Sequence, residues 1–157
     1  MPSACATAYS AILPPLVREQ LNARGVLAAE DHPLNQKLIA AQMQKMGVDL
    51  TLVGNGAEAL EAVKTRFYGM ILMDCQMPVM DGFNATRAIR AWERGGAQPE
   101  ARLNPAYIVA VTAGALPGDR EACLDAGMND YLTKPAQAED LARVFSAWAE
   151  RMLAPAA

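Results

Sequence analysis

Residues 70–74 read Met-Ile-Leu-Met-Asp, four apolar side chains followed directly by a carboxylate. A short, fully apolar run of this kind indicates a strand that is buried on both faces, as strands of parallel sheets are. Asp74 then stands where this strand ends, and ligands of open parallel sheets bind at that edge. The stretch therefore predicts both the class of sheet and the place where chemistry is expected.

On both sides of this run, strand-like segments alternate with segments that repeat apolar residues every three or four positions, which is typical of one helix face. Gly47 and Gly127 follow two of the helical segments, as expected of helix ends. The predicted strands are residues 26–29, 50–53, 70–73, 107–111 and 131–133. The alternation predicts an α/β fold, a (βα)5 doubly wound parallel sheet of five strands. For its strand order we take 2-1-3-4-5, the flavodoxin-like order of such sheets.

The first 24 residues differ from the rest, because they are rich in Ala and Pro and lack this alternation. We interpret 1–24 as a linker or the tail of an upstream segment, in which Pro14 and Pro15 are compatible with the start of a short helix. Residues 25–153 are predicted to form one domain, with a C-terminal tail over 154–157. The sequence suggests no role for the polar loop 95–105, which is long for such a fold.

Composition excludes several classes of function. The 157 residues are 52% hydrophobic with a net charge of −3, a globular balance, and Lys and Arg do not cluster as nucleic-acid binding requires. No apolar run reaches the roughly 20 residues that a membrane-spanning helix needs. The three cysteines are too far apart for a metal site or a disulfide framework. We therefore expect a reduced, cytoplasmic location without direct membrane contact and without nucleic acid as a partner.

Polar side chains stand at the ends of the predicted strands: Glu30, Asp31, Asp74, Thr112 and Lys134. Neighbouring strands lie about 4.8 Å apart, so the acids of the first and third strands would crowd one pocket. Two carboxylates about 5 Å apart repel by roughly 3 kcal/mol at an effective dielectric near 20, which calls for a cation or a proton. An all-oxygen site suits Mg²⁺, and a lysine holds phosphate as a point charge. A carboxylate nucleophile, a divalent cation and a lysine are the parts of phosphoryl transfer to Asp.

Four stretches of the chain resemble the CheY-like receiver domain of response regulators and hybrid sensor histidine kinases. They are residues 30–36, 73–82, 111–113 and 131–135, in the order and at the spacing of that family. The resemblance extends over residues 26–152 of the 157. It implies the same flavodoxin-like fold that the alternation of strands and helices predicts.

The resemblance implies a role for each matching residue. Asp74 would be the phosphoacceptor. Glu30, Asp31 and Asp74 would hold Mg²⁺, with the backbone carbonyl of Gln76 as a further ligand. Lys134 would pair with the phosphoryl oxygens.

The resemblance also implies a conformational switch. Thr112 would turn inward to the phosphoryl group, and Tyr131 would follow it from an exposed to a buried rotamer. The Lys134–Pro135 bond would be cis. His32 stands where Asn is frequent in the family, and we interpret it as a loop histidine rather than a phosphate carrier.

The implied function is that of a phosphoacceptor module in two-component or phosphorelay signalling. Its partner would be a histidine kinase or a histidine phosphotransfer domain. By itself the module would be no enzyme beyond self-phosphorylation from small donors and autodephosphorylation. We favour the receiver part of a hybrid histidine kinase, whose parent would be a protein-histidine kinase tethered to the membrane. A stand-alone regulator and a phosphorylation-independent pseudo-receiver stay open, as does weak dimerisation.

An enzyme that turns over small phosphate esters through an aspartyl-phosphate is the alternative from another class. Such haloacid-dehalogenase-like enzymes carry a second Asp two residues after the nucleophile. This chain has Gln76 at that position and no room for a cap domain. The sequence therefore favours the signalling module.

Overall fold

The protein is described by a computed structural model that covers residues 13–96, 98–99, 104–114 and 118–153. Predictions that concern residues 1–12, 154–157, Pro117 and the middle of the 95–105 loop fall outside these described residues.

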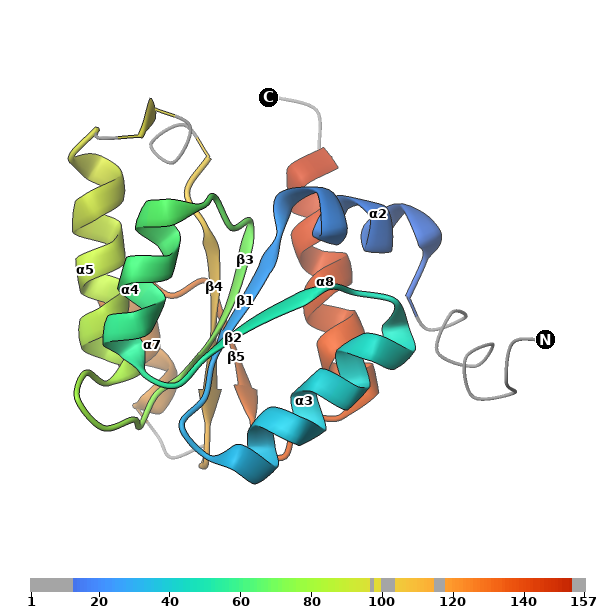
Figure 1. Cartoon of the computed structure of the whole chain (residues 1–157), viewed down its shortest axis with the longest axis horizontal. Coiled ribbons are helices and arrows are strands. Elements are labelled where there is room, and N and C mark those ends of the chain that lie inside the picture. Colours follow the sequence, from blue (N-terminus) through green and yellow to red (C-terminus); the bar gives the residue numbers. More distant parts are fainter. Residues whose placement is uncertain (1–12, 97, 100–103, 115–117, 154–157) are drawn as a thin grey trace.

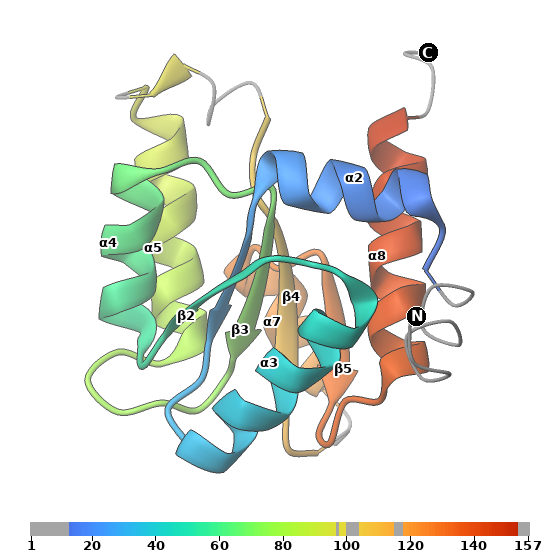
Figure 2. The same cartoon turned by 45° about the vertical axis from the view of Figure 1, so that its right-hand side comes forward.

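Five parallel strands form one sheet in the order β2-β1-β3-β4-β5, which confirms the predicted α/β class and strand order. Figures 1 and 2 show the twisted sheet with helices on both faces. The strands are β1 Val26–Ala29, β2 Leu50–Val53, β3 Met70–Asp74, β4 Tyr107–Thr112 and β5 Asp130–Thr133.

Helices of the described residues cover the sheet in two groups, α3 with α8 and α4 with α5 and α7, each with its own core cluster. The bounds are α2 Pro15–Arg24, α3 Pro33–Met46, α4 Gly56–Thr65, α5 Gly82–Arg94, α7 Asp119–Ala126 and α8 Ala138–Leu153. Gly47 and Gly127 cap α3 and α7 in left-handed conformations, with φ of 75° and 106°, as their positions predicted. No helix among the described residues is long and apolar enough to cross a membrane.

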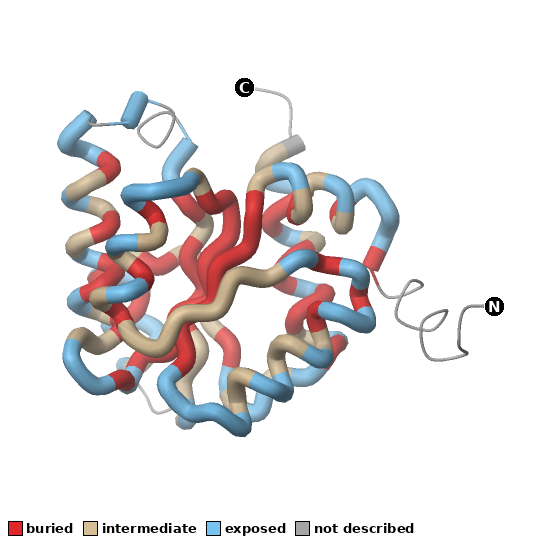
Figure 3. The backbone as a smooth tube through the Cα atoms, viewed as in Figure 1, coloured by how far each residue is buried: buried red, intermediate tan, exposed pale blue. Residues whose placement is uncertain are grey.

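Strands β1 and β3 are apolar up to Asp74, the last residue of β3, because both of their faces are covered. Every residue of β1 and β3 is buried, and these strands form the red centre of Figure 3. Successive side chains point to opposite faces. Thus Leu72 belongs to the cluster under α3 and α8, whereas Ile71 and Met73 belong to the cluster under α4, α5 and α7.

The chain after β3 is pressed tightly against the end of that strand. Gly82, the first residue of α5, donates its N–H to the carbonyl of Cys75 over 3.1 Å. A Cβ atom at Gly82 would collide with the carbonyl oxygen of Asp74, so no larger residue fits there without movement. Asp81 caps α5 by accepting from the N–H of Asn84 over 2.8 Å. These contacts hold the loop that follows Asp74.

Part of the segment interpreted as a linker is helix α2, which packs across α8. Leu13 and Leu21 are fully buried and lie in the same core cluster as Trp148. Asn22 joins α2 to the turn after α3, because it donates to the carbonyl of Gly47 over 3.0 Å and accepts from the N–H of Asp49 over 2.8 Å. The apolar face of this helix is thus part of the core, although the domain boundary predicted at residue 25 remains a prediction.

Candidate functional site

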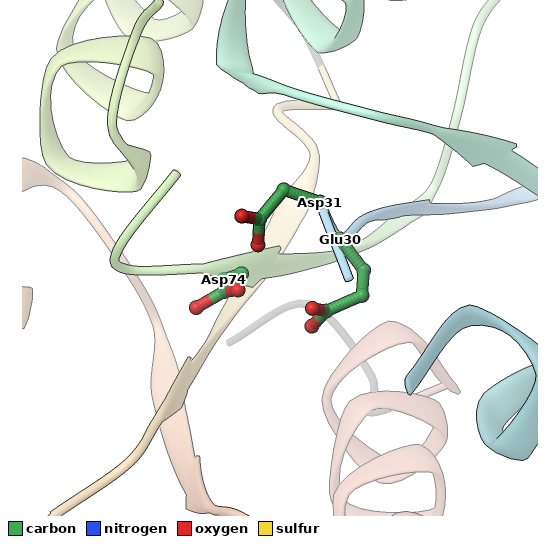
Figure 4. Close-up of side chains that lie close together, drawn as sticks. All are labelled: Glu30, Asp31 and Asp74. Atoms are coloured by element: carbon green, nitrogen blue, oxygen red, sulfur yellow. The ribbon is translucent and has the colours of Figure 1, made fainter. Parts of the chain in front are cut away.

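Three acids converge at the carboxyl ends of two neighbouring strands. Glu30 and Asp31 follow β1, Asp74 ends β3, and carboxylate oxygens of all three lie within 4.8 Å of one another (Figure 4). Glu30 and Asp74 are buried, with 6% and 3% of their surfaces exposed, whereas Asp31 is exposed. The structure therefore brings together the acids that their positions at strand ends predicted.

Lys134 supplies positive charge to this cluster from the loop after β5. Its Nζ donates to Oδ2 of Asp74 over 2.8 Å and lies 3.2 Å from Oε2 of Glu30. The main-chain N–H of Lys134 donates to the carbonyl of Thr112 over 2.7 Å, which ties its loop to the end of β4. One ammonium group thus bridges two buried carboxylates, while the third carboxylate faces solvent.

The environment of Asp74 disfavours its charge. Burial raises the pKa of Asp74 above its ordinary value, and the nearby charge of Glu30 raises it further. Lys134 and the N–H of Gln76, which donates to Oδ1 over 3.2 Å, lower the pKa without cancelling this effect. The ionised Asp74 carboxylate is therefore short of positive charge.

Glu30 and Lys134 are held in their charged forms. Burial raises the pKa of Glu30, but hydrogen bonds from the N–H of His32, from Lys134 and from Asn35 outweigh it, so the pKa lies below its usual value. Burial lowers the pKa of Lys134, but Asp74 and Glu30 outweigh that effect and raise it. The shifts favour the charged forms of both Glu30 and Lys134, in contrast to Asp74.

A cavity of about 510 Å³ opens beside Asp31, the exposed acid of the three. Asp31 and Gln76 line it together with residues of the loop that follows β3. Clustered carboxylate oxygens, with space for water, match what Mg²⁺ requires. The position assigned to the Gln76 carbonyl as a further ligand remains a prediction.

The two residues assigned to a switch lie nearby on β4 and β5. Thr112 is half-buried, and its hydroxyl donates to the carbonyl of Gly114 over 3.1 Å. Tyr131 is half-buried and packs against the cluster under α4, α5 and α7. To reach a phosphoryl group on Asp74, the Thr112 hydroxyl would have to give up its bond to Gly114.

The sequence assigned no role to the carboxamide residues of α3, although Asn35 and Gln36 contact the site. His32 caps α3, because its Nδ1 accepts from the N–H of Leu34 over 3.2 Å. Asn35 donates to Oε1 of Glu30 over 3.3 Å, and Gln36 donates to the Glu30 carbonyl over 2.6 Å. Carboxamides on a surface helix carry no local signal of such contacts. The Lys134–Pro135 peptide bond is cis.

The family model for the response regulator receiver domain matches residues 26–146. The chain therefore belongs to the receiver domain family. The sensor histidine kinase GacS of Pseudomonas protegens is 42% identical over 132 residues, which are 83% of this chain and 14% of GacS. BarA, a signal transduction histidine-protein kinase of Escherichia coli, is 41% identical over 127 residues, 81% of this chain and 13% of BarA. The chain thus spans a small part of these relatives.

Solved receiver domains share the fold at high coverage. The receiver domain of the sensor histidine kinase PA1611 from Pseudomonas aeruginosa, with magnesium coordinated in its active site cleft, is 46% identical with a TM-score of 0.67, covering 78% of this chain and 94% of that one. The receiver domain of Ssk1 from Saccharomyces cerevisiae, solved with the histidine phosphotransfer protein Ypd1, gives 33% identity and a TM-score of 0.74, covering 82% and 91%.

Proposed function

We propose that this receiver domain takes a phosphoryl group from a phosphohistidine onto Asp74 in a Mg²⁺-dependent reaction. The observation that carries the proposal is the arrangement of Asp74, which is buried beside Glu30 and paired with the ammonium of Lys134. A carboxylate that is short of positive charge and lies within 4.8 Å of the exposed Asp31 is suited to bind a cation and then to accept phosphorus.

Glu30, Asp31 and Asp74 would hold the Mg²⁺ ion, with the Gln76 carbonyl as a further ligand. When bound, the ion would neutralise the acids and the charge that develops on the transferring phosphoryl oxygens. The magnesium in the cleft of the PA1611 receiver supports this assignment. The exposed carboxylate of Asp31 would be the ligand nearest to solvent.

In the transfer step, a carboxylate oxygen of Asp74 attacks phosphorus while the phosphorus–nitrogen bond of the donor histidine breaks. The bonding electrons leave with the imidazole nitrogen, and an acyl phosphate forms on Asp74. Lys134 then exchanges its contact with Oδ2 of Asp74 for the phosphoryl oxygens. The ammonium group of Lys134 therefore follows the negative charge from the Asp74 carboxylate to the phosphoryl group.

The new phosphoryl oxygens offer strong acceptors within the pocket. Thr112 would exchange its bond to Gly114 for one of them, and Tyr131 would move into the space that Thr112 leaves. Such a change shifts a two-state equilibrium over the face formed by α7, β5 and α8.

Apolar side chains exposed around the site fit a protein donor. Leu34 is 68% exposed, Leu38 46% and Val79 85%, and the first two lie on α3. A histidine kinase or a histidine phosphotransfer domain would dock there, as the complex of Ssk1 with Ypd1 supports. We assign the chain to a hybrid histidine kinase, as in its relatives GacS and BarA, with a stand-alone regulator as the alternative. By itself it would be an acceptor module that also reacts with small donors.

Intact-protein mass after incubation with acetyl phosphate tests the proposal. We expect one phosphoryl increment that requires Mg²⁺, disappears in Asp74→Asn and persists in Asp125→Asn, a control at an exposed acid of α7. Incorporation that persists in Asp74→Asn would refute the assignment of the acceptor. No incorporation in the wild type, together with failure to bind beryllofluoride, would identify a docking module that works without phosphorylation.

A further inference from the structure

Helix α3 contacts the catalytic groups at two separate places through carboxamide side chains. Near its start, Asn35 and Gln36 hold Glu30. The next contact of this kind along α3 is that of Gln42, six residues after Gln36, whose Nε2 donates to the carbonyl of Ala136 over 2.8 Å. Gln42 and Ala136 are 94 positions apart in the chain, so only the fold brings them together.

The first place sets the orientation of the Glu30 carboxylate. Its Oε1 accepts from Asn35 over 3.3 Å and from the N–H of His32 over 3.1 Å, which turns Oε2 toward Lys134. Gln36 also fixes the main chain at Glu30 through the 2.6 Å bond to its carbonyl. Outer residues that orient a ligand in this way control metal affinity.

The second place holds the loop that carries Lys134. Ala136 follows Lys134 by two residues, so the bond from Gln42 anchors this loop on the side of α3. On the other side, the N–H of Lys134 donates to the carbonyl of Thr112 over 2.7 Å. The reach of the lysine toward Asp74 therefore depends on two anchors, of which one is supplied by α3.

Apolar packing holds α3 against the sheet through Ile39, Met43 and Met46, which lie in one core cluster with Ala28. Beside the catalytic groups this packing is incomplete. A cavity of about 400 Å³ opens there, and its lining includes Ala28 of β1, Leu38 and Ile39 of α3, and Lys134. The carboxamide hydrogen bonds therefore supplement apolar packing where α3 meets the catalytic groups.

We propose that α3 positions the two halves of the site separately. Asn35 sets Glu30 and thereby the affinity for Mg²⁺, whereas Gln42 sets the Lys134 loop and thereby the rate of phosphoryl transfer. Both are positioning residues, and this inference rests on the proposed function. A donor that docks on the exposed Leu34 and Leu38 of the same helix would act on both sets of bonds.

The test uses the full chain with Asn35→Ala, Gln42→Leu and the control Gln44→Ala, an exposed position on the same helix. Mg²⁺ affinity is measured by amide chemical shifts without a donor, and the rate of phosphorylation by acetyl phosphate at saturating Mg²⁺. We expect Asn35→Ala to weaken Mg²⁺ binding by about tenfold and to leave the saturated rate within about twofold. Gln42→Leu should lower the rate by about three- to tenfold and leave Mg²⁺ affinity unchanged.

If each variant changes a different quantity, Asn35→Ala the Mg²⁺ affinity and Gln42→Leu the rate of phosphorylation, the residues act by positioning. A loss of stability would instead lower the Mg²⁺ affinity and the rate together. Equal losses of affinity and rate in both variants, or no change in either, would overturn the inference. Thermal unfolding of each variant identifies a loss that comes from the fold alone. A wild type that neither binds Mg²⁺ nor accepts a phosphoryl group would refute the proposed function and this inference with it. If the wild type binds Mg²⁺ and is phosphorylated, but the two variants do not change different quantities, only the inference is refuted.

Discussion

Both ends of the sheet bury acidic side chains, but their surroundings differ. At the carboxyl end, Glu30 and Asp74 share Lys134 while Asp31 adds a further charge within 4.8 Å. At the amino end, the buried acid is Glu93, which is 5% exposed. The guanidinium of Arg90 donates to its Oε1 over 2.8 Å, and a main-chain N–H donates to its Oε2 over 2.7 Å.

The other two nitrogens of the Arg90 guanidinium also donate hydrogen bonds. Its Nε donates to the Gly127 carbonyl over 2.9 Å, and its other terminal nitrogen donates to Oδ1 of Asn129 over 2.8 Å. The same oxygen accepts from the N–H of Ile108 over 2.8 Å, which extends the network into β4. At the amino end, the charge of Glu93 is thus balanced by Arg90 in a network that links a helix to the sheet. At the carboxyl end, the acids outnumber Lys134, and a cation and a phosphoryl group are proposed to bind there. The same acid-to-amide change should thus have opposite effects at the two ends.

The largest expected effect is that of Asp74→Asn. It should abolish phosphoryl incorporation and, without Mg²⁺, raise the melting temperature. An acid whose pKa is higher in the folded than in the unfolded protein destabilises the fold once the pH exceeds its unfolded pKa, and the amide removes this penalty. Thermal unfolding of Asp74→Asn and wild type in EDTA at neutral pH measures the change in melting temperature. A lower melting temperature in the variant would mean that the lost bond to Lys134 outweighs the removed penalty.

Leu21→Ala tests whether α2 is a structural part of the amino end. Its side chain is fully buried, so we expect the free energy of unfolding to fall by about 3 kcal/mol. Urea unfolding measures this, with Leu16→Ala as the control, since Leu16 lies on the same helix but is 51% exposed. Equal effects of the two changes would show that α2 contributes little to the core. Phosphorylation of the folded fraction should remain.

Glu93→Gln should destabilise the protein by about 2 kcal/mol, because one of the two buried donors at Glu93 would face an amide NH₂ group. Urea unfolding beside Asp74→Asn gives the direct comparison, in which the two amides should shift stability in opposite directions. If Glu93→Gln raised the free energy of unfolding, the proposed difference between the amino and carboxyl ends of the sheet would be wrong.

The smallest expected effect is the stabilisation of the folded protein by Mg²⁺. Mg²⁺ at about ten times its dissociation constant should raise the free energy of unfolding by about 1.4 kcal/mol. The gain should shrink in Asp31→Asn and persist in Glu93→Gln, which leaves the carboxyl end intact. Thermal unfolding at increasing Mg²⁺ measures both. A full gain in Asp31→Asn would remove this residue from the ligand set.

Sequence patterns predicted the sheet well because strands buried on both faces consist of uninterrupted apolar runs. The predicted strand boundaries differ from the observed ones by a single residue, for example at Thr112, where β4 ends, and at Asp130, where β5 begins. The convergence of Glu30, Asp31 and Asp74 was also predictable, since neighbouring parallel strands end at one edge. A short helix starting near Pro14 and Pro15 was compatible with the sequence, but the segment was interpreted as a linker, because ten residues give little signal of the partner against which they pack.

The sequence by itself therefore determined the order of the elements, the class of fold and the acids that meet at the strand ends, because each depends on local periodicity and on where a run stops. Only the tertiary structure decided that Leu21 is core, that Gln42 holds the Lys134 loop, and that Arg90 closes a network around Glu93. Hydrogen bonds and contacts between distant segments depend on how helices lie on the sheet, and polar side chains in a helix look alike in sequence whether they face water or a catalytic loop.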